Sequence, residues 1–457
     1  MKNLKNKEFE FNKLFFTIAL GGALISSAAN AVDFHGYVRS GISESTGGGQ
    51  EAWLASKLGR FGNETDGWWG MSFSQDIVKT NDGKSMAVFS KLEGDTPLTG
   101  TDDWTYGDIY GGNGHMGLTE FYLTANGYIP AIPEASLWVG KRAYGNHEVQ
   151  LLDYKPVLSS GNGFGIDGIK AGVGELSVGI KRNDQNSSSW TTTSQTPVYD
   201  NTGTQSGYIN STTSNSTKFN VDYVDVRYSK IPLVSDVTME VIGQYAIVDK
   251  TDEQKQLISQ GTIYDAENSF IPTVIISKPV GKGFNETYFQ YGQKRSANNL
   301  VKLGYNDTYT TTFDDNYSNA NAYRIINDGE TYLSDNVVMA HAIAYSAGSD
   351  ITPTLENVHS FNVVARPAYI WTQNHKTAVE LGWFKQVNTV SGVDKEEMGK
   401  KVTLAHIISA GPSAFARPDF RFYTTYIKAD KNEIDNMTFN NGKNSQVSFG
   451  VQVEAWW

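Results

Sequence analysis

The chain has 457 residues, of which 39% are hydrophobic and 12% aromatic, and its formal net charge is −11 with 45 glycines and no cysteine. The lack of cysteine excludes disulfides, thiolate zinc sites and cysteine nucleophiles. The negative charge, without any concentrated stripe of Lys and Arg, argues against a nucleic-acid partner. Many glycines and aromatics beside a modest hydrophobic fraction favour a β protein with many turns over a helical core.

Residues 1–31 have the pattern of a removable export signal. The first 13 residues include four lysines, a short apolar run covers Leu14–Ala23, and Ala29-Asn30-Ala31 forms a small-x-small cleavage site. The apolar run is too short to cross a bilayer, and no later stretch approaches the roughly 20 apolar residues that a membrane helix needs. We therefore expect an exported chain, residues 32–457, without a spanning helix.

Short segments of alternating apolar and polar residues recur along the chain. In chain order, clear examples are ELSVGIK (175–181), TMEVIGQYAI (238–247), TAVELGWF (377–384) and VSFGVQVEAWW (447–457). In the last segment Val447, Phe449 and Val451 share one face, while Ser448 and Glu454 share the other. A period of two predicts strands, and no comparable run keeps the 3.6 period of a helix. Taken alone, such strands fit a soluble β core and a membrane barrel about equally.

The connections between the predicted strands come in two sizes. Short turns such as Lys230–Asp236 contrast with long polar stretches, Asn183–Asn220 and Asn298–Asn321. Bacterial outer-membrane barrels have short turns on one side and long loops on the other. A soluble protein does not need the export signal, the polar inward face and the terminal aromatic residue together. With no linker, heptad or clear repeat, we expect one all-β barrel domain over residues 32–457.

Six segments, in the same order along the chain, resemble the maltoporin-type carbohydrate porin family. They are VDFHGYVRSG (32–41), GRFGNE (59–64), WVGKRAYGNHEVQLLDY (138–154), ARPAYIW (365–371), RPDFRFYTTYIK (417–428) and VQVEAWW (451–457). SKLGRFGNE (56–64), DVRYSKIPL (225–233) and YIKADKNEID (426–435) are more similar to the cryptic β-glucoside porin branch. The resemblance implies an 18-stranded antiparallel transmembrane β-barrel with an inward-folded constriction loop. It also implies a homotrimer in the bacterial outer membrane that passes sugars without a cofactor or a metal.

In this family a row of aromatic side chains, the greasy slide, guides sugars through the pore. By position, Tyr37 in HGYVR, Trp68 in ETDGWW and Trp371 in AYIW correspond to slide residues. Trp104 in TDDWTYGD corresponds to a loop tryptophan that reaches into the neighbouring subunit. Most other aromatic residues are expected in the lipid-facing belts and in the trimer contact.

Two further slide positions correspond less directly. Phe270 stands near one of them, although the alignment places Pro272 at that position. The slide tryptophan that the family carries near its C-terminus finds no counterpart, since KADKNEID offers Asn432. The terminal aromatic residue is expected in the interface belt, where a ring with a polar edge is stable.

The resemblance also implies a polar track beside the slide. Its candidates are Arg39, Arg60, Arg142, Asn146, Glu148, Asp153 and Lys155. Glu148 and Asp153 keep the acidic character of the constriction loop, whereas Asn146 replaces an arginine and Lys155 replaces a tyrosine. These replacements lie where the family pore is narrowest, so the identity of the sugar that this chain would pass stays open. For Arg142, an ion pair without a transport role is the competing interpretation.

Three other functions fit parts of the sequence. A barrel enzyme would need a catalytic motif, but the seven histidines are scattered without metal spacing and G-x-S-x-G is absent. Glu148 and Asp153 leave glycoside hydrolysis open. A non-selective porin would show opposed charges in place of an aromatic row. Long loops favour use as an adhesin or phage receptor as a side role. The other expected partners are sugars, outer-membrane lipids and identical subunits.

Overall fold

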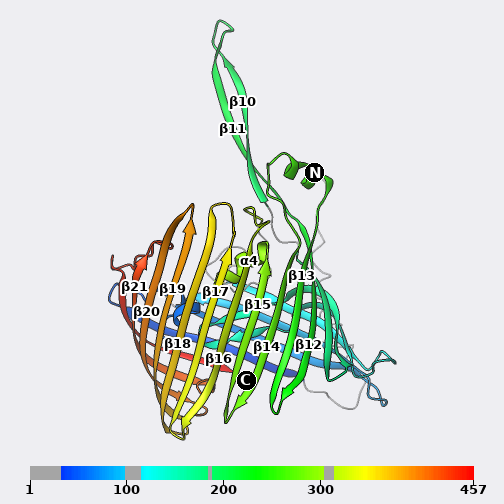
Figure 1. Cartoon of the computed structure of the whole chain (residues 1–457), viewed down its shortest axis with the longest axis vertical. Coiled ribbons are helices and arrows are strands. Elements are labelled where there is room, and N and C mark those ends of the chain that lie inside the picture. The colour runs from blue at the N-terminus through cyan, green and yellow to red at the C-terminus, as the bar shows by residue number, and fades with distance from the viewer. Residues whose placement is uncertain (1–31, 98–114, 184–187, 303–312) are drawn as a thin grey trace, which may run out of the picture.

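The computed structural model describes residues 32–97, 115–183, 188–302 and 313–457. Within these residues, 18 strands form one antiparallel sheet that closes into a barrel, because β1 pairs with both β2 and β22 (Figure 1). The barrel strands are β1 (Asp33–Ser45), β2 (Asp66–Lys79), β3 (Ser85–Pro97), β4 (His115–Asn126), β5 (Ser136–Ala143), β8 (Ser160–Ala171), β9 (Gly174–Asn183), β12 (Asn220–Val234), β13 (Val237–Asp249), β14 (Ser269–Val280), β15 (Gly283–Gln293), β16 (Asn321–Ser334), β17 (Val337–Ser349), β18 (Leu355–Thr372), β19 (His375–Val390), β20 (Val393–Ser409), β21 (Asp419–Asn432) and β22 (Ser445–Trp456).

The remaining elements lie in the connections between barrel strands. They are α2 (Ala55–Leu58), β6 (His147–Val149), η2 (Gln150–Leu152), β7 (Tyr154–Val157), β10 (Ser188–Tyr199), β11 (Gln205–Thr217), α3 (Asp252–Ser259) and α4 (Arg295–Val301). None of the helices in the described parts of the chain is long and apolar enough to cross a membrane. The scarcity of helix predicted from the sequence is confirmed.

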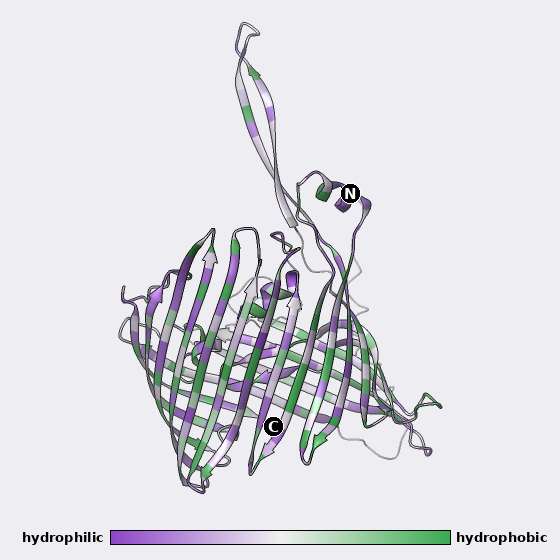
Figure 2. Cartoon of the chain, in the orientation of Figure 1, coloured by the Kyte–Doolittle hydropathy of each residue, from purple (hydrophilic) through white to green (hydrophobic). Residues whose placement is uncertain are grey.

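The predicted alternation is confirmed in β9, β13, β19 and β22. In β22, Phe449 is 56% exposed on the outer face, whereas Glu454 is 0% exposed on the inner face. Apolar and polar residues alternate in the same way along the wall (Figure 2). A soluble protein buries its apolar face. This reversed arrangement, with the apolar face outside, indicates that the hydrocarbon of a lipid bilayer surrounds the barrel.

The two ends of the barrel have different connections. At one end, pairs such as β8–β9, β12–β13 and β14–β15 are joined by two residues each. The predicted turn 230–236 is shorter than expected, because β12 continues to Val234 and only Ser235 and Asp236 turn. At the other end, most of the stretch 183–220 forms the hairpin β10–β11, which projects beyond the barrel (Figure 1). Its many threonines suit a strand better than a loop.

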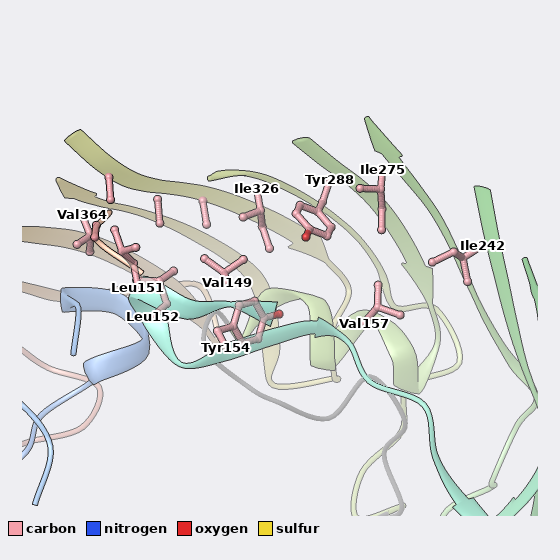
Figure 3. Packing of buried hydrophobic residues seen from close by; sticks show 14 residues of the cluster. Val149, Leu151, Leu152, Tyr154, Val157, Ile242, Ile275, Tyr288, Ile326 and Val364 are labelled. Atoms are coloured by element: carbon pink, nitrogen blue, oxygen red, sulfur yellow. The ribbon is translucent and has the colours of Figure 1, made fainter. Parts of the chain in front are cut away.

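The connection from β5 to β8, residues 144–159, folds into the barrel. Its apolar side chains, among them Val149, Leu152 and Tyr154, are buried against the inner wall (Figure 3). The wall contributes small and branched residues such as Ile326 and Val364 to the same cluster. Burying a side chain of this size is worth about 1.5–3 kcal/mol relative to exposure, so hydrophobic packing holds the loop inside.

Three inner-wall side chains also fix the backbone of this loop. Arg227 Nη2 donates to the carbonyl oxygen of Tyr144 at 3.2 Å, at the start of the loop. Gln290 Nε2 and Arg324 Nη2 donate to the carbonyl oxygen of Pro156 at 2.9 and 3.3 Å. The loop is therefore clamped to the wall near both of its ends.

The connection from β1 to β2, residues 46–65, is a second inward segment. Leu58 and Phe61 are buried, and the backbone N–H of Phe61 donates to Glu380 Oε1 at 3.0 Å. The Asn63 side chain accepts from Trp53 N at 2.8 Å and donates to Trp53 O at 2.9 Å. These contacts fix the path of the segment and bring Arg60 against the inner wall, where its side chain reaches Glu454 on β22.

Candidate functional site

A cavity of about 730 Å³ lies inside the barrel beside the inward loop. Seven of the residues predicted from the sequence line it, namely Tyr37, Arg39, Arg60, Trp68, Glu148, Asp153 and Lys155. The strand register explains part of this grouping, because Arg39 on β1 lies opposite Trp68 on β2 and both face inward. Tyr37 lies two positions before Arg39 on the same strand, and the two inward segments contribute Arg60, Glu148, Asp153 and Lys155.

The structure does not bring Trp371 or Phe270 to this cavity. In β18 the buried inner-face residues include Ala368 and Ile370, so Trp371 belongs to the outer face and is 60% exposed. Its ring lies 4.5 Å from that of Tyr369. The same alternation in β14 puts Phe270 on the outer face. Both rings occupy the lipid-facing side of the wall, as interface aromatics do.

Arg142 and Asn146 lie near the start of the inward loop and not at the cavity. Arg142 Nη1 is 2.7 Å from Asp167 Oδ2, and its guanidinium lies 5.2 Å above the ring of Trp138. This contact puts Arg142 on the side of the wall that faces the interior. Asn146 Oδ1 accepts from the backbone N–H of Ser159 at 2.9 Å and so closes the base of the loop.

Trp104, the remaining predicted site residue, lies outside the described residues. Its predicted entry into a neighbouring subunit therefore stays a prediction.

Buried ion pairs hold the arginines of the cavity in place. Arg39 Nη1 is 3.0 Å from Glu64 Oε1, and Arg60 Nε is 2.5 Å from the same oxygen. Arg60 Nη2 also reaches Glu454 Oε1 at 3.0 Å, where the hydroxyl of Tyr37 donates at 2.7 Å. Each carboxylate therefore accepts several hydrogen bonds, as a buried charge requires.

The network continues from Glu454 toward the end of the barrel with the short turns. Glu454 Oε2 accepts from Arg417 Nε at 2.8 Å and from Arg421 Nη2. The guanidinium of Arg417 lies 4.8 Å from the ring centroid of Trp456. An aromatic face thus stands directly beside the charged network on the inner wall.

The two acidic residues of the inward loop have opposite pKa shifts. Burial raises the pKa of Glu148 above its ordinary value, and the charge of Asp153 adds to this effect against that of Lys155. Burial would also raise the pKa of Asp153, but the cations Arg60, Arg39 and Lys155 outweigh it and hold the pKa of Asp153 below its ordinary value. Asp153 stays ionised beside Arg39 Nη1 at 3.3 Å, while Glu148 takes up a proton more readily.

Sequence reasoning missed several residues of the lining. Trp456 lines the cavity, although the resemblance gave no slide tryptophan near the C-terminus. The sequence signal that could have found it is its position on the polar face of β22, which it shares with Glu454. Phe284 and Phe415 line the other side, with ring centroids 5.6 Å apart. Lys91 also belongs to the lining, and no local pattern marked it. The lining therefore combines aromatic faces with paired charges.

An antiparallel barrel of 18 strands with an apolar exterior and a polar interior defines an outer-membrane porin, a multi-pass β-barrel. The sequence profile described as LamB porin matches residues 32–457. The chain belongs to the LamB porin family, as its resemblance to maltoporin-type porins predicted.

Solved porin structures are similar at low identity. The Salmonella typhi OmpF complex with daunomycin is 9% identical with a TM-score of 0.44, over 94% of this chain and 99% of that chain. OccD3 of Pseudomonas aeruginosa is 10% identical with a TM-score of 0.46, over 93% and 91%. A loop L8 deletion mutant of OmpT from Vibrio cholerae is 11% identical with a TM-score of 0.42, over 94% and 100%.

Proposed function

We propose that this porin is sugar-selective and passes oligosaccharides or glycosides down their gradient without covalent chemistry. The observation that carries the proposal is the grouping of Tyr37, Trp68 and Trp456 beside Arg39 and Glu454 in one cavity. A pyranose presents an apolar C–H face and a rim of hydroxyls, so it matches a wall of aromatic rings with charged groups between them.

Passage follows from contacts that are numerous and individually weak. The rings of Trp68 and Trp456 stack on sugar faces, while hydroxyls exchange partners among carboxylates and guanidinium groups. Because Glu454 and Arg60 already satisfy one another, neither holds a sugar tightly. Binding is then strong enough for entry and weak enough for release, as conduction requires.

The inward loop supplies the groups that discriminate between sugars. Glu148, Asp153 and Lys155 line the cavity from this loop. Asp153 is fixed by Arg39, so its oxygens present acceptors at a defined place. Lys155 stands where maltoporin-type porins carry a tyrosine. The lysine has no ring on which a sugar can stack, but its ammonium group offers three hydrogen-bond donors. The preferred sugar therefore differs from a maltodextrin.

We assign the chain to the cryptic β-glucoside branch of the family on three segments: 56–64, 225–233 and 426–435. The first of these segments supplies Arg60 and Glu64 to the cavity network. By the same resemblance the porin works as a homotrimer surrounded by outer-membrane lipids. Removal of residues 1–31 on export completes the proposal; they lie outside the described residues.

Permeation rates of isomeric disaccharides test the proposal. Proteoliposomes carrying the porin are diluted into maltose, cellobiose or sucrose, which have equal mass, and the swelling rates are compared. A sugar-selective pore gives rates that differ between the isomers. Equal rates would mean that size alone governs passage, and the protein would be a non-selective porin in which the charges of the lining dominate.

A further inference from the structure

Two carboxylates face each other on the inner wall of the barrel. Glu286 on β15 and Asp328 on β16 are directly opposed in the strand register. Both face inward, because Tyr288 and Ile326, two positions away on the same strands, belong to the cluster that buries the inward loop (Figure 3). Opposed side chains in a sheet lie about 4.5–5.5 Å apart at Cβ, and like charges at that spacing destabilise the sheet.

The surrounding residues do not neutralise this pair. Glu286 accepts hydrogen bonds from two neutral hydroxyls, Ser277 at 2.9 Å and Tyr288 at 2.6 Å. Asp328 is only 4% exposed, and its Oδ1 has no hydrogen-bond partner among the described residues. Within that same part of the chain, neither carboxylate forms an ion pair with a lysine, arginine or histidine. Two adjacent acids thus share no counter-charge.

Asp328 also lines the cavity, where Phe284 and Phe415 are its aromatic neighbours in the lining. Three other carboxylates of the lining are matched: Glu93 lies 2.7 Å from Lys91 Nζ, Asp153 lies 3.3 Å from Arg39 Nη1, and Glu454 is held by three arginines. Asp328 therefore places an acid with no ion pair in the described parts of the chain beside the space through which a permeating molecule passes.

We propose that Glu286 and Asp328 bind an ammonium group carried by the permeating sugar, so that the preferred substrate class is an amino sugar. This inference rests on the proposed function and names its substrate class. A sugar hydroxyl offers this pair only a neutral donor, whereas an ammonium supplies three donors and the missing positive charge. The ring faces of Phe284 and Phe415 also attract a cation within about 6 Å.

The test uses three β-linked disaccharides that differ at C2: cellobiose carries a hydroxyl, di-N-acetylchitobiose an acetamide and chitobiose an ammonium. Block of the single-channel current is titrated with each sugar near neutral pH, because acid would charge the amine fully but would also protonate the carboxylate pair. We expect chitobiose to bind about tenfold more tightly than cellobiose, the ratio that one charge-assisted hydrogen bond gives over a neutral one. Asp328→Asn should remove this preference, so that the variant binds chitobiose no more tightly than cellobiose.

Two further variants make the outcome decisive. Glu286→Gln removes the other member of the pair and should also abolish the preference, so the result does not depend on one variant folding. Asp76→Asn removes a carboxylate that lies outside the cavity lining and pairs with Lys79 at 2.7 Å, and it should keep the preference.

Equal block by all three sugars in the wild-type pore would overturn the inference and leave the sugar-selective pore standing. A preference that survives both Asp328→Asn and Glu286→Gln would overturn it as well. No block by any of the three sugars would instead contradict the proposed function.

Discussion

Arg60 and Glu454 are joined at 3.0 Å across a sequence separation of 394 residues, with side chains only 4% and 0% exposed. Arg60 belongs to the inward segment between β1 and β2, and Glu454 belongs to the strand that closes the barrel. The ion pair thus ties the lining of the cavity to the closure of the wall. The same contact therefore fixes one side of the cavity and stabilises the closed wall.

The pair of tryptophans Trp68 and Trp371 gives a matched test of the aromatic lining. Trp68→Ala should weaken sugar block of the channel about tenfold. The substitution removes both the stacking contact of the ring and the apolar area that it buries against the sugar. Trp371→Ala, on the outer face, should leave sugar block unchanged. The measurement is a titration of single-channel current with the preferred sugar, and equal losses in both variants would refute the placement of these rings.

Glu454→Gln should destabilise the barrel strongly. The carboxylate meets Arg60, Arg417 and Arg421, and removing one partner from a buried ion pair costs about 3–5 kcal/mol. The free energy of unfolding is measured in urea with the protein in lipid vesicles, followed by tryptophan fluorescence. As a control, Asp82→Asn at an exposed pair should change nothing measurable. A Glu454 variant as stable as wild type would show that the network is dispensable.

Leu152→Ala should loosen the inward loop and raise the single-channel conductance. Leu152 is 1% exposed within the cluster that holds the loop to the wall, and its truncation costs about 2–5 kcal/mol. Leu333→Ala, at a residue that is 63% exposed, is the matched control and should conduct as wild type does. Unchanged conductance in Leu152→Ala would mean that the loop does not limit the pore.

The cation selectivity of the pore should fall as the pH is lowered. Burial raises the pKa of Glu148, so this carboxyl takes up a proton at a higher pH than an ordinary glutamate, while Asp153 with its lowered pKa stays ionised. Loss of one negative charge in the cavity makes the pore less selective for cations. Reversal potentials in a salt gradient, recorded during acidification, measure the change. Glu148→Gln should lack the fall in cation selectivity that protonation of Glu148 causes. A titration identical to that of the wild type would assign this change to another group.

Lys155→Tyr should shift the preference of the pore toward maltodextrins. The substitution returns a ring to a cavity-lining position where maltoporin-type porins have tyrosine. The comparison is the ranking of maltotriose against cellobiose by channel block, in wild type and variant. An unaltered ranking would show that this position does not set specificity.

Much of the barrel could be predicted from local patterns. The period of two in β22 assigned both faces of the closing strand correctly, because side-chain direction in a strand is set by the backbone alone. The same rule, applied to Trp371, would have placed it with Tyr369 on the outer face. The resemblance predicts a pore-facing Trp371 from its position in the family motif, whereas the side chain lies on the outer face of β18.

The parts of the site that escaped prediction depend on the closed fold. Asp328 and Phe415 come together with Tyr37 only because the sheet closes and the turn 410–418 folds inward. Glu330 Oε2 accepts from the backbone N–H of Ala414 at 2.6 Å and holds this turn. Contacts across so many residues leave no local period in the sequence, so no window of the chain reveals them.

Single-channel conductance of the purified porin in a planar bilayer tests the central claim most directly. The current is titrated with maltotriose, sucrose, cellobiose and an aryl-β-glucoside. The aromatic and charged lining around Trp68 and Arg60 predicts concentration-dependent block by at least one of these sugars, with different affinities among them. A steady current in the presence of every sugar would contradict a sugar-binding pore.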